Sequence, residues 1–266
     1  MKLAHVFAAA MAMACGISAL GACQSIQGIG TLPSLDGGAT GTDGGSSACT
    51  LKGTCTAFET TVPSTGQRAC LPQGQCTPTD TSNYAPRWAA PLQRTESCTN
   101  AQIDNAFLLC LGSAAGDEEE CNNWFADVAN KGCASCLRTS PGQSPSGAFI
   151  GYGAFAQINQ GGCVALSSPC NDSCARAIGA AADCRHHACE VEAGGTCDPS
   201  NGVSDEEIAK CFARAGSGPN CACSELFSTA QACYAKLDTS TQALCNAQSE
   251  ADFLRIAKFM CGPCTN

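Results

Sequence analysis

The feature that most constrains this chain is the density of cysteine between Cys98 and Cys264. This stretch of 167 residues contains 18 of the 24 cysteines in the 266-residue sequence. Charged residues make up only 14% of the chain and aromatic residues only 6%, so a core without cross-links would bury little apolar area per residue. We therefore expect disulfides to supply much of the stability of the fold.

Cysteine spacings near the two ends of this stretch resemble one another. Near its start, two eleven-residue gaps between cysteines are followed by a Cys-x2-Cys pair, and near its end one such gap is again followed by such a pair. The spacing predicts two imperfect copies of a cross-linked helical unit around a less regular middle. The candidate disulfide residues are Cys98, Cys110, Cys121, Cys133, Cys136, Cys233, Cys245, Cys261 and Cys264.

Capping signals predict that these cysteines lie on short helices. Thr99 and Gln102 form a capping-box pattern before an amphipathic segment, and Ser249 and Asp252 form another before the last cysteines. Cys174–Cys184 is rich in alanine and typical of a helix. Residues 138–153 are rich in Ser, Gly and Pro and predict a loop, whereas residues 154–170 carry a mixed signal that assigns no element. For residues 97–266 we expect an all-α, disulfide-rich domain of short stapled helices and helical hairpins.

The first two predicted helices form an antiparallel hairpin. The acidic run Asp117–Glu120 suits the start of the second helix because of the helix dipole, and Lys131–Gly132 suits its end. A hairpin brings the end of one helix close to the start of the next. The pairings expected are Cys110 with Cys121, and Cys98 with Cys133 or Cys136.

Residues 1–22 have the form of a secretory signal, with Lys2 followed by an apolar run that ends in small residues. The segment Leu20–Cys23 resembles the bacterial lipobox, which directs lipidation of the cysteine and cleavage before it. We predict that Cys23 is the lipidated first residue of the mature protein, with an ordinary secreted protein as the alternative. Without Cys15 and Cys23, 22 cysteines remain, an even number that suits a fully oxidised exported protein.

Residues 23–48 are rich in Gly, Ser and Thr and predict a disordered, flexible tether. The residue after Cys23 is Gln24 and not Asp, which in bacterial lipoproteins implies the outer membrane, either facing the periplasm or on the surface. The lipid would attach the protein to this membrane.

Residues 49–76 contain four cysteines, and their β-rich composition around a Pro/Gly turn predicts a small hairpin module. Two internal disulfides would hold it, and a zinc site made from the four thiolates is the alternative. Residues 77–96 are expected to form a connector. The four cysteines are Cys49, Cys55, Cys70 and Cys76.

The lipobox, the tether and the helical Cys-x11-Cys units ending in Cys-x2-Cys resemble the cysteine-rich exported lipoproteins of myxobacteria. The segment Asn159–Leu166, followed by Cys174–Ala177 and Cys184, adds to the resemblance. The resemblance covers most of residues 98–264 and consists mainly of cysteine spacings. It implies an exported protein of unknown function, with no activity to assign to particular residues.

Cys261-Gly-Pro-Cys264 matches the active-site tetrapeptide of thioredoxin-like oxidoreductases, in which a low thiol pKa drives disulfide exchange. Such a motif has a strand before it and a helix after it, whereas here a helix precedes it and two residues follow. We therefore expect structural cystines at these positions. A thiol–disulfide oxidoreductase using Cys261 and Cys264 is the enzymatic alternative.

His186 and His187 are the histidines that remain after removal of the signal, and acidic residues and cysteines surround them. A metal site at this pair is a second alternative. Adjacent helical residues point about 100° apart, so a solvated polar turn is the preferred interpretation. The net charge of −9 argues against a nucleic-acid partner, and motifs for nucleotide, hydrolase or metalloprotease chemistry are absent from the sequence.

The sequence thus predicts a non-catalytic, lipid-anchored envelope or surface protein with a binding or scaffolding role and no cofactor. Its partners would be the membrane, through the N-terminal lipid, and an unknown envelope or extracellular molecule. The loops Arg138–Gly147 and Cys189–Ser204 are the segments expected to face that molecule.

Overall fold

The computed structural model describes part of the chain. The described residues are 26–27, 56–62, 76, 78, 81, 84–92, 96–111, 118–152, 155–189, 195–198, 201–217, 221 and 223–264. The predicted signal, Cys23, most of the tether and most of the four-cysteine module lie outside this set. No helix in the described ranges has the length and apolar character needed to cross a membrane.

The described part of the chain is mostly helical, which confirms the expected fold class, and it carries one small sheet. The α-helices are α1 (Asn100–Ala106), α2 (Glu118–Ala126), α3 (Lys131–Leu137), α4 (Gln160–Ser167), α5 (Asp172–Ala188), α6 (Asp205–Ser217), α7 (Ser224–Tyr234), α8 (Thr239–Cys245) and α9 (Glu250–Cys261). The strands are β1 (Ile26–Gln27), β2 (Arg138–Thr139), β3 (Phe149–Tyr152) and β4 (Phe155–Ile158). A π-helix η1 (Phe107–Leu111) and the 3-10 helices η2 (Val128–Asn130) and η3 (Pro169–Asn171) complete the elements.

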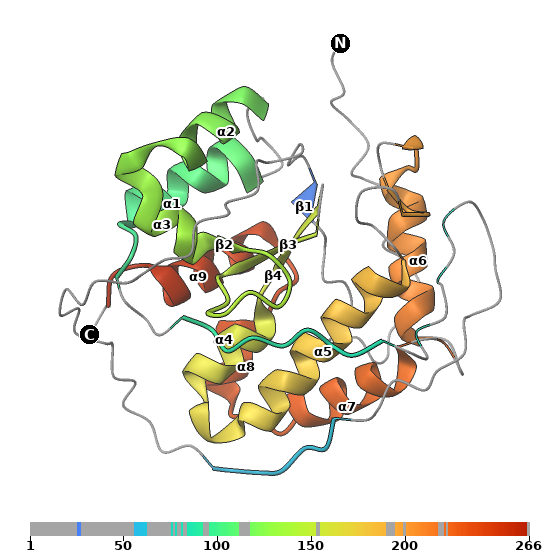
Figure 1. Cartoon of the computed structure of the whole chain (residues 1–266). Helices are drawn as coiled ribbons and strands as arrows, with labels where there is room; N and C mark the ends of the chain where they lie inside the picture. Colours follow the sequence, from blue (N-terminus) through green and yellow to red (C-terminus); the bar gives the residue numbers. More distant parts are fainter. Residues whose placement is uncertain are drawn as a thin grey trace.

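The sheet lies between two groups of helices (Figure 1). Helices α1, α2, α3 and α9 gather on one side, and α4, α5, α7 and α8 gather on the other, where α5 packs against α4 and α7. Helix α6 packs against α5 and α7. Helix α9 joins the two groups, since it contacts α1 and α3 on one side and α4 and α8 on the other.

The prediction of a loop at residues 138–153 is wrong, because β2 and β3 lie there and gain their hydrogen bonds from strand pairing; β4 lies in the unassigned residues 154–170. Strands β3 and β4 form an antiparallel hairpin, β2 pairs with β3 in parallel, and β1 adds to the other edge beside β4. Phe149 and Ile158 face one another across the hairpin and are fully buried. Ile26–Gln27 belongs to the predicted tether, so two of its residues are ordered in the sheet.

Capping predicted the helix starts better than the helix ends. Both capping boxes, at Thr99 and at Ser249, are present. The predicted end of the second helix is wrong, because α2 stops at Ala126. Asp127 has an extended backbone and caps η2 through a hydrogen bond from the Ala129 N–H. Val128 is 85% exposed as a result.

Both disulfides predicted for the first helical hairpin are confirmed. They are Cys110–Cys121 and, of the two alternatives, Cys98–Cys133. The prediction of two copies of one cross-linked unit is wrong. Cys233, Cys245 and Cys261 of the last unit each bond to a cysteine outside that unit. Six further bonds are Cys136–Cys261, Cys163–Cys245, Cys174–Cys233, Cys184–Cys223, Cys189–Cys211 and Cys76–Cys197, and Cys170, Cys221 and Cys264 are also oxidised.

The predicted four-cysteine module is not self-contained, since Cys76 bonds to Cys197 across 121 residues. This pairing also removes Cys76 from any four-thiolate zinc site. Residues 56–62 form no strand and lie along the start of α5. There the Phe58 N–H donates to Asn171 Oδ1 at 3.0 Å, and the Thr60 N–H donates to Ser173 Oγ at 3.2 Å. The cysteines Cys49, Cys55 and Cys70 lie outside the described residues.

Candidate ligand-binding site

A cavity of about 50 Å³ lies where the small sheet, α4, α5, α7 and the extended segment 84–92 meet. This volume is the space open to the centre of a water-sized sphere, and one water needs ~10–15 Å³ of it, so the cavity has room for several waters or for one small organic molecule. Segment 84–92, part of the predicted connector, crosses α4 and α5 in Figure 1. It is tied to the loop before β3, because the Leu92 N–H donates to the Ser146 carbonyl and the Ser146 N–H donates to the Ala90 carbonyl.

The Trp88 ring lines the cavity, and two glycines make room for it. A Cβ on Gly179 of α5 would lie 2.5 Å from Trp88 Cε3, and a Cβ on Gly161 of α4 would lie 2.9 Å from Trp88 Cζ3. Real Cβ atoms do not approach so closely, so the indole fits only because both positions lack a side chain. The indole therefore packs directly on the crossing point of α4 and α5.

Asp183 is a buried carboxylate at the wall of the cavity, with 2% of its surface exposed. Its Oδ1 accepts the Tyr152 hydroxyl at 3.1 Å and forms an ion pair with Arg87 Nη2 at 3.0 Å. Its Oδ2 accepts the Arg87 backbone N–H at 2.7 Å. These contacts neutralise the charge of Asp183 and attach segment 84–92 to α5.

His186 and His187 do not form a solvated turn, because they lie in the last turn of α5. His186 is buried and stacks on Tyr152 with ring centroids 3.8 Å apart, whereas His187 is exposed and stacks on Tyr84. Burial lowers the pKa of His186 well below 6.5, and the charges of Arg185 and Arg87 lower it further. The two rings face different neighbours, as the helical angle between them requires.

Arg185 is the unusual cation of this site. It lines the cavity with 6% of its surface exposed, and it makes no ion pair or hydrogen bond through its side chain to the described residues. Its guanidinium carbon lies 4.7 Å from the centre of the Phe227 ring and 5.6 Å from that of Phe212. Aromatic faces attract a guanidinium, but they do not accept its in-plane N–H groups.

Three buried polar atoms of the cavity lining have no hydrogen-bond partner among the described residues: Trp88 Nε1, Gln157 Oε1 and Arg185 Nε. Gln157 lies on β4 and is 4% exposed. Buried polar groups are nearly always paired, so a group of orphans around one cavity indicates water or a ligand. The cavity thus combines an apolar floor at Ile178 and Phe227 with hydrogen-bonding groups that are already in place.

The structure separates the two cysteines of the predicted redox motif. Cys261 is fully buried and bonds to Cys136 on α3, whereas Cys264 belongs to a different disulfide. The motif follows α9 instead of preceding a helix. The Cys261/Cys264 pair therefore has neither the shared bond nor the helix N-terminus that thioredoxin-like exchange requires.

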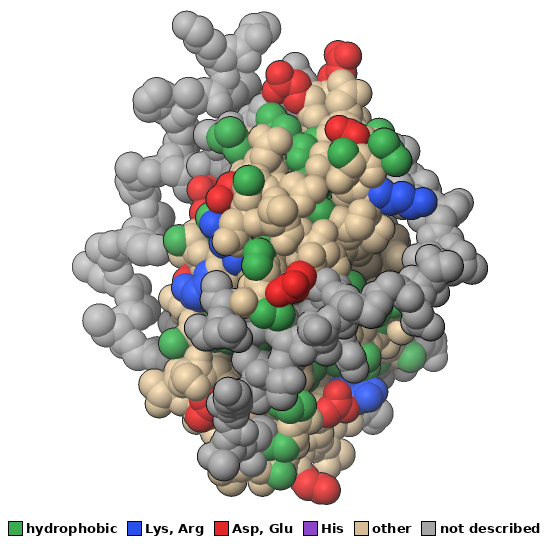
Figure 2. Space-filling view, turned by 90° about the vertical axis from the view of Figure 1, so that its left-hand side faces the viewer, with side chains coloured by type: hydrophobic (Ala, Val, Ile, Leu, Met, Phe, Trp, Pro, Cys, Tyr) green, Lys and Arg blue, Asp and Glu red, His purple; other side chains and the backbone are tan. Residues whose placement is uncertain are grey.

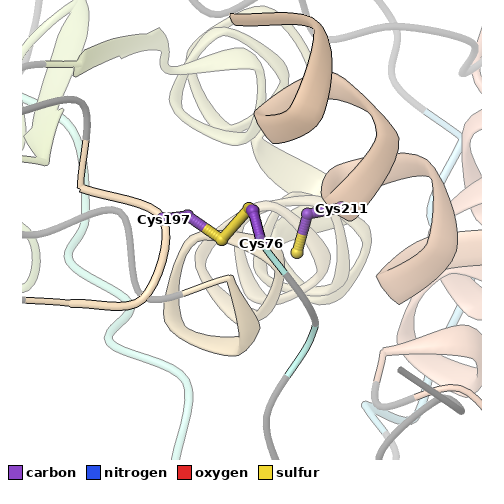
Figure 3. Close-up of side chains that lie close together, drawn as sticks. All are labelled: Cys76, Cys197 and Cys211. Atoms are coloured by element: carbon purple, nitrogen blue, oxygen red, sulfur yellow. A yellow bond between two sulfur atoms is a disulfide. The ribbon is translucent and has the colours of Figure 1, made fainter. Parts of the chain in front are cut away.

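Three sulfurs gather elsewhere, at the end of α5. The Sγ atoms of Cys76, Cys197 and Cys211 lie within 4.8 Å of one another, with the Cys76–Cys197 bond beside Cys211 (Figure 3). Cys211 is itself bonded to Cys189. Oxidised sulfurs are poor metal ligands because metals take thiolates, so this group is a pair of adjacent disulfides. Within the described residues His186 and His187 belong to no group of three potential metal ligands.

The loops predicted to face a partner are only partly exposed. Ser146 and Gly147 are buried at the end of the first loop, and Cys197 and Asp198 are buried in the second. Residues 142–145 are exposed. On the face drawn in Figure 2, acidic and basic side chains are interspersed and hydrophobic side chains are scattered, without the continuous apolar area that marks a large protein interface.

The sequence reasoning missed the residues of the cavity, although α5 carries one usable signal. Cys174, Ile178, Ala181 and Arg185 recur at helical spacing and share the buried face of α5. An arginine in register with three small or apolar residues is unusual on a buried face. The partners in segment 84–92 and in β4 are more than 20 residues away and have no local signal.

Comparison with known proteins adds no assignment: no family model, curated protein or solved structure matches this chain.

Proposed function

We propose that this protein is a non-catalytic, lipid-anchored protein of the bacterial envelope that binds a small molecule in the cavity that Trp88 lines. The observation that carries the proposal is the set of three buried polar atoms in the cavity lining that lack a hydrogen-bond partner within the described part of the chain. Such atoms gain free energy when a ligand supplies the missing hydrogen bonds, because their desolvation has already taken place on folding.

Preorganisation of the cavity wall supports a binding role. Disulfides hold α5 near its start, at Cys174, and near its end, at Cys184 and Cys189. The Arg87–Asp183 ion pair holds segment 84–92 against the same helix. A site that is already ordered loses little conformational entropy when a ligand binds.

The disulfides indicate an oxidising, extracytoplasmic compartment, because every cysteine in the described ranges is oxidised. The finer assignment to the outer membrane is part of the proposal. It rests on the lipobox-like sequence Leu20–Cys23, on Gln24 and on the resemblance to myxobacterial lipoproteins. The exposed residues 142–145 are the surface we assign to a further envelope partner.

Lipidation is tested with the full-length protein and its Cys23→Ser variant. We expect the wild-type protein to partition into the detergent phase of Triton X-114 and the variant to remain in the aqueous phase. Mass spectrometry of the N-terminal peptide should show acyl groups on Cys23. An unmodified N-terminus generated by cleavage at another site would contradict the anchor.

Binding is tested by screening neutral, anionic and cationic small molecules against the oxidised protein and recording the indole N–H signals of its two tryptophans, Trp88 and Trp124. We expect at least one class to shift the Trp88 signal saturably while leaving that of Trp124 in place. Gln157→Leu should weaken that binding, whereas Gln248→Leu, a change at an exposed position, should not. A Trp88 signal that no class shifts would overturn the proposed function.

A further inference from the structure

We propose that the ligand is a small monocarboxylate, whose carboxylate pairs with Arg185 and whose apolar end lies against Ile178 and Phe227. This inference rests on the binding role proposed above and specifies its chemistry. It starts from Arg185, which is more than nine-tenths buried in the cavity lining and forms no ion pair with any described acid, since Asp183 pairs with Arg87.

Among the residues that the structure describes, the charges around the cavity leave one positive charge uncompensated. Arg87 and Asp183 form an ion pair and cancel. His186 stays neutral at ordinary pH, because burial and the two arginines disfavour its charged form. Arg185 then remains as a buried cation in a protein whose overall net charge is −9. Uncompensated buried charge is costly, so a group that brings one negative charge is favoured here.

The hydrogen-bonding groups suit a carboxylate. A guanidinium donates in a planar fork that matches the two oxygens of a carboxylate. The Nε–H of Arg185 is unused, and the Trp88 indole offers a second unused donor at the same cavity. The amide of Gln157 adds a polar end whose assignment as oxygen or nitrogen can be exchanged to suit the ligand.

The remaining lining selects against strongly hydrated dianions. Ile150, Ile178, Ala181, Phe227 and Ala230 present apolar surface to the cavity. A phosphate would bring more negative charge than Arg185 neutralises and would place polar oxygens against these side chains. A monocarboxylate with a short hydrocarbon tail satisfies both the cation and the apolar surface.

Acetate and isobutyrate are the probes, and acetamide and isobutyramide are their neutral counterparts. The oxidised full-length protein is titrated in a buffer free of other carboxylates and of phosphate, and the Trp88 indole N–H signal is followed. We expect saturable shifts with millimolar affinity for the acids, tighter for isobutyrate than for acetate. Each amide should bind at least tenfold more weakly than its acid.

Arg185→Gln should weaken binding of isobutyrate at least tenfold. Lys210→Gln removes one positive charge from a half-exposed site on α6 outside the cavity, and it should leave the affinity unchanged. If Arg185→Gln does not fold, Arg185→Lys retains the charge and loses the fork, and it should weaken binding by a smaller factor.

Equal binding of acid and amide, or full affinity in both Arg185 variants, would overturn the carboxylate inference and leave the binding function standing. The same holds if only neutral or cationic probes shift the Trp88 signal. If no probe shifts it, the cavity holds water alone, and both proposals fail.

Discussion

Cys136 and Cys261 are joined by a disulfide that connects α3 to the end of α9 across 125 residues of sequence. The bond takes one cysteine from each of the two Cys-x2-Cys motifs of the chain. It closes the first helical unit onto the last helix, with Cys98–Cys133 beside it in the sequence. The two motifs thus act together as a clamp between distant parts of the fold.

Removing this clamp by Cys136→Ala with Cys261→Ala should destabilise the protein substantially. Because the Cys163–Cys245 bond bridges most of the chain between Cys136 and Cys261, the clamp closes a loop of only about 45 residues. For a loop of this length, chain entropy predicts that the free energy of unfolding falls by ~4 kcal/mol when the bond is removed. Urea unfolding with the other disulfides intact measures it. The control pair Cys110→Ala with Cys121→Ala opens a much shorter loop, and the same relation gives ~3 kcal/mol. A smaller loss for the clamp than for the control would contradict this account.

Gly179→Ala should displace Trp88 from the crossing of α4 and α5. The new Cβ would lie 2.5 and 2.6 Å from two atoms of the indole ring, so the free energy of unfolding should fall by ~1–3 kcal/mol, and the Trp88 indole signal should move. Gly132→Ala in α3 is the matched control. Its Cβ would meet only the Ser97 carbonyl oxygen, at 3.8 Å, so this substitution in a helix should raise the free energy of unfolding by ~0.5–1 kcal/mol.

His186 should make the stability depend on pH below 6.5. Its pKa in the folded protein lies well below 6.5, so the unfolded chain binds a proton at pH values where the folded protein does not. Stability is therefore complete above pH 6.5 and falls as the pH is lowered, by ~1 kcal/mol between pH 6.5 and about 5.5. Arg185 and Arg87 act on this ring from the cavity side, and Phe212 of α6 packs against it.

Denaturant unfolding at several pH values tests this dependence. His186→Phe keeps an aromatic ring against Tyr152 and should flatten the profile between pH 6.5 and about 5.5. His187→Phe leaves the buried histidine intact and should retain the wild-type slope. An unchanged slope in His186→Phe would assign the dependence to other groups.

Cys189→Ala should trigger disulfide exchange at the end of α5. It frees Cys211, whose sulfur lies within 4.8 Å of those of Cys76 and Cys197. The Cys211 thiolate then attacks that bond, a new disulfide forms, and the displaced cysteine leaves as a thiol. Non-reducing peptide maps should show Cys211 bonded to Cys76 or to Cys197.

The control for this exchange is Cys121→Ala, which frees Cys110. Cys110 belongs to no group of three potential metal ligands within the described residues, so it should remain a single free thiol. Alkylation of Cys211 alone in the Cys189→Ala variant would show that the neighbouring bond is not accessible to it.

Local features of the fold were predictable from sequence. The capping boxes at Thr99 and Ser249 and the buried stripe of α9 depend on residues within one or two turns of each other. Cys110–Cys121 was predictable for the same reason, since a hairpin brings the two helix ends together. The break in the helix at Asp127 was not predictable from sequence. The helix propensities of the residues around it do not distinguish one more α-helical turn from a short 3-10 turn.

The density and spacing of the cysteines, with the capping signals between them, by themselves determined that this chain folds as an oxidised, mostly helical protein. With only 6% aromatic residues, the chain has few large apolar side chains to form a core without cross-links. Only the tertiary structure decided which distant sulfurs meet. The repeated spacing at Cys233 and Cys245 gives bonds to α5 and α4, not to its own unit. The cavity was decided in the same way, because Trp88, Gln157 and Arg185 meet only after three separate segments pack. Periodicity and spacing describe neighbours along the chain, whereas burial and pairing depend on which faces the packed helices present to one another.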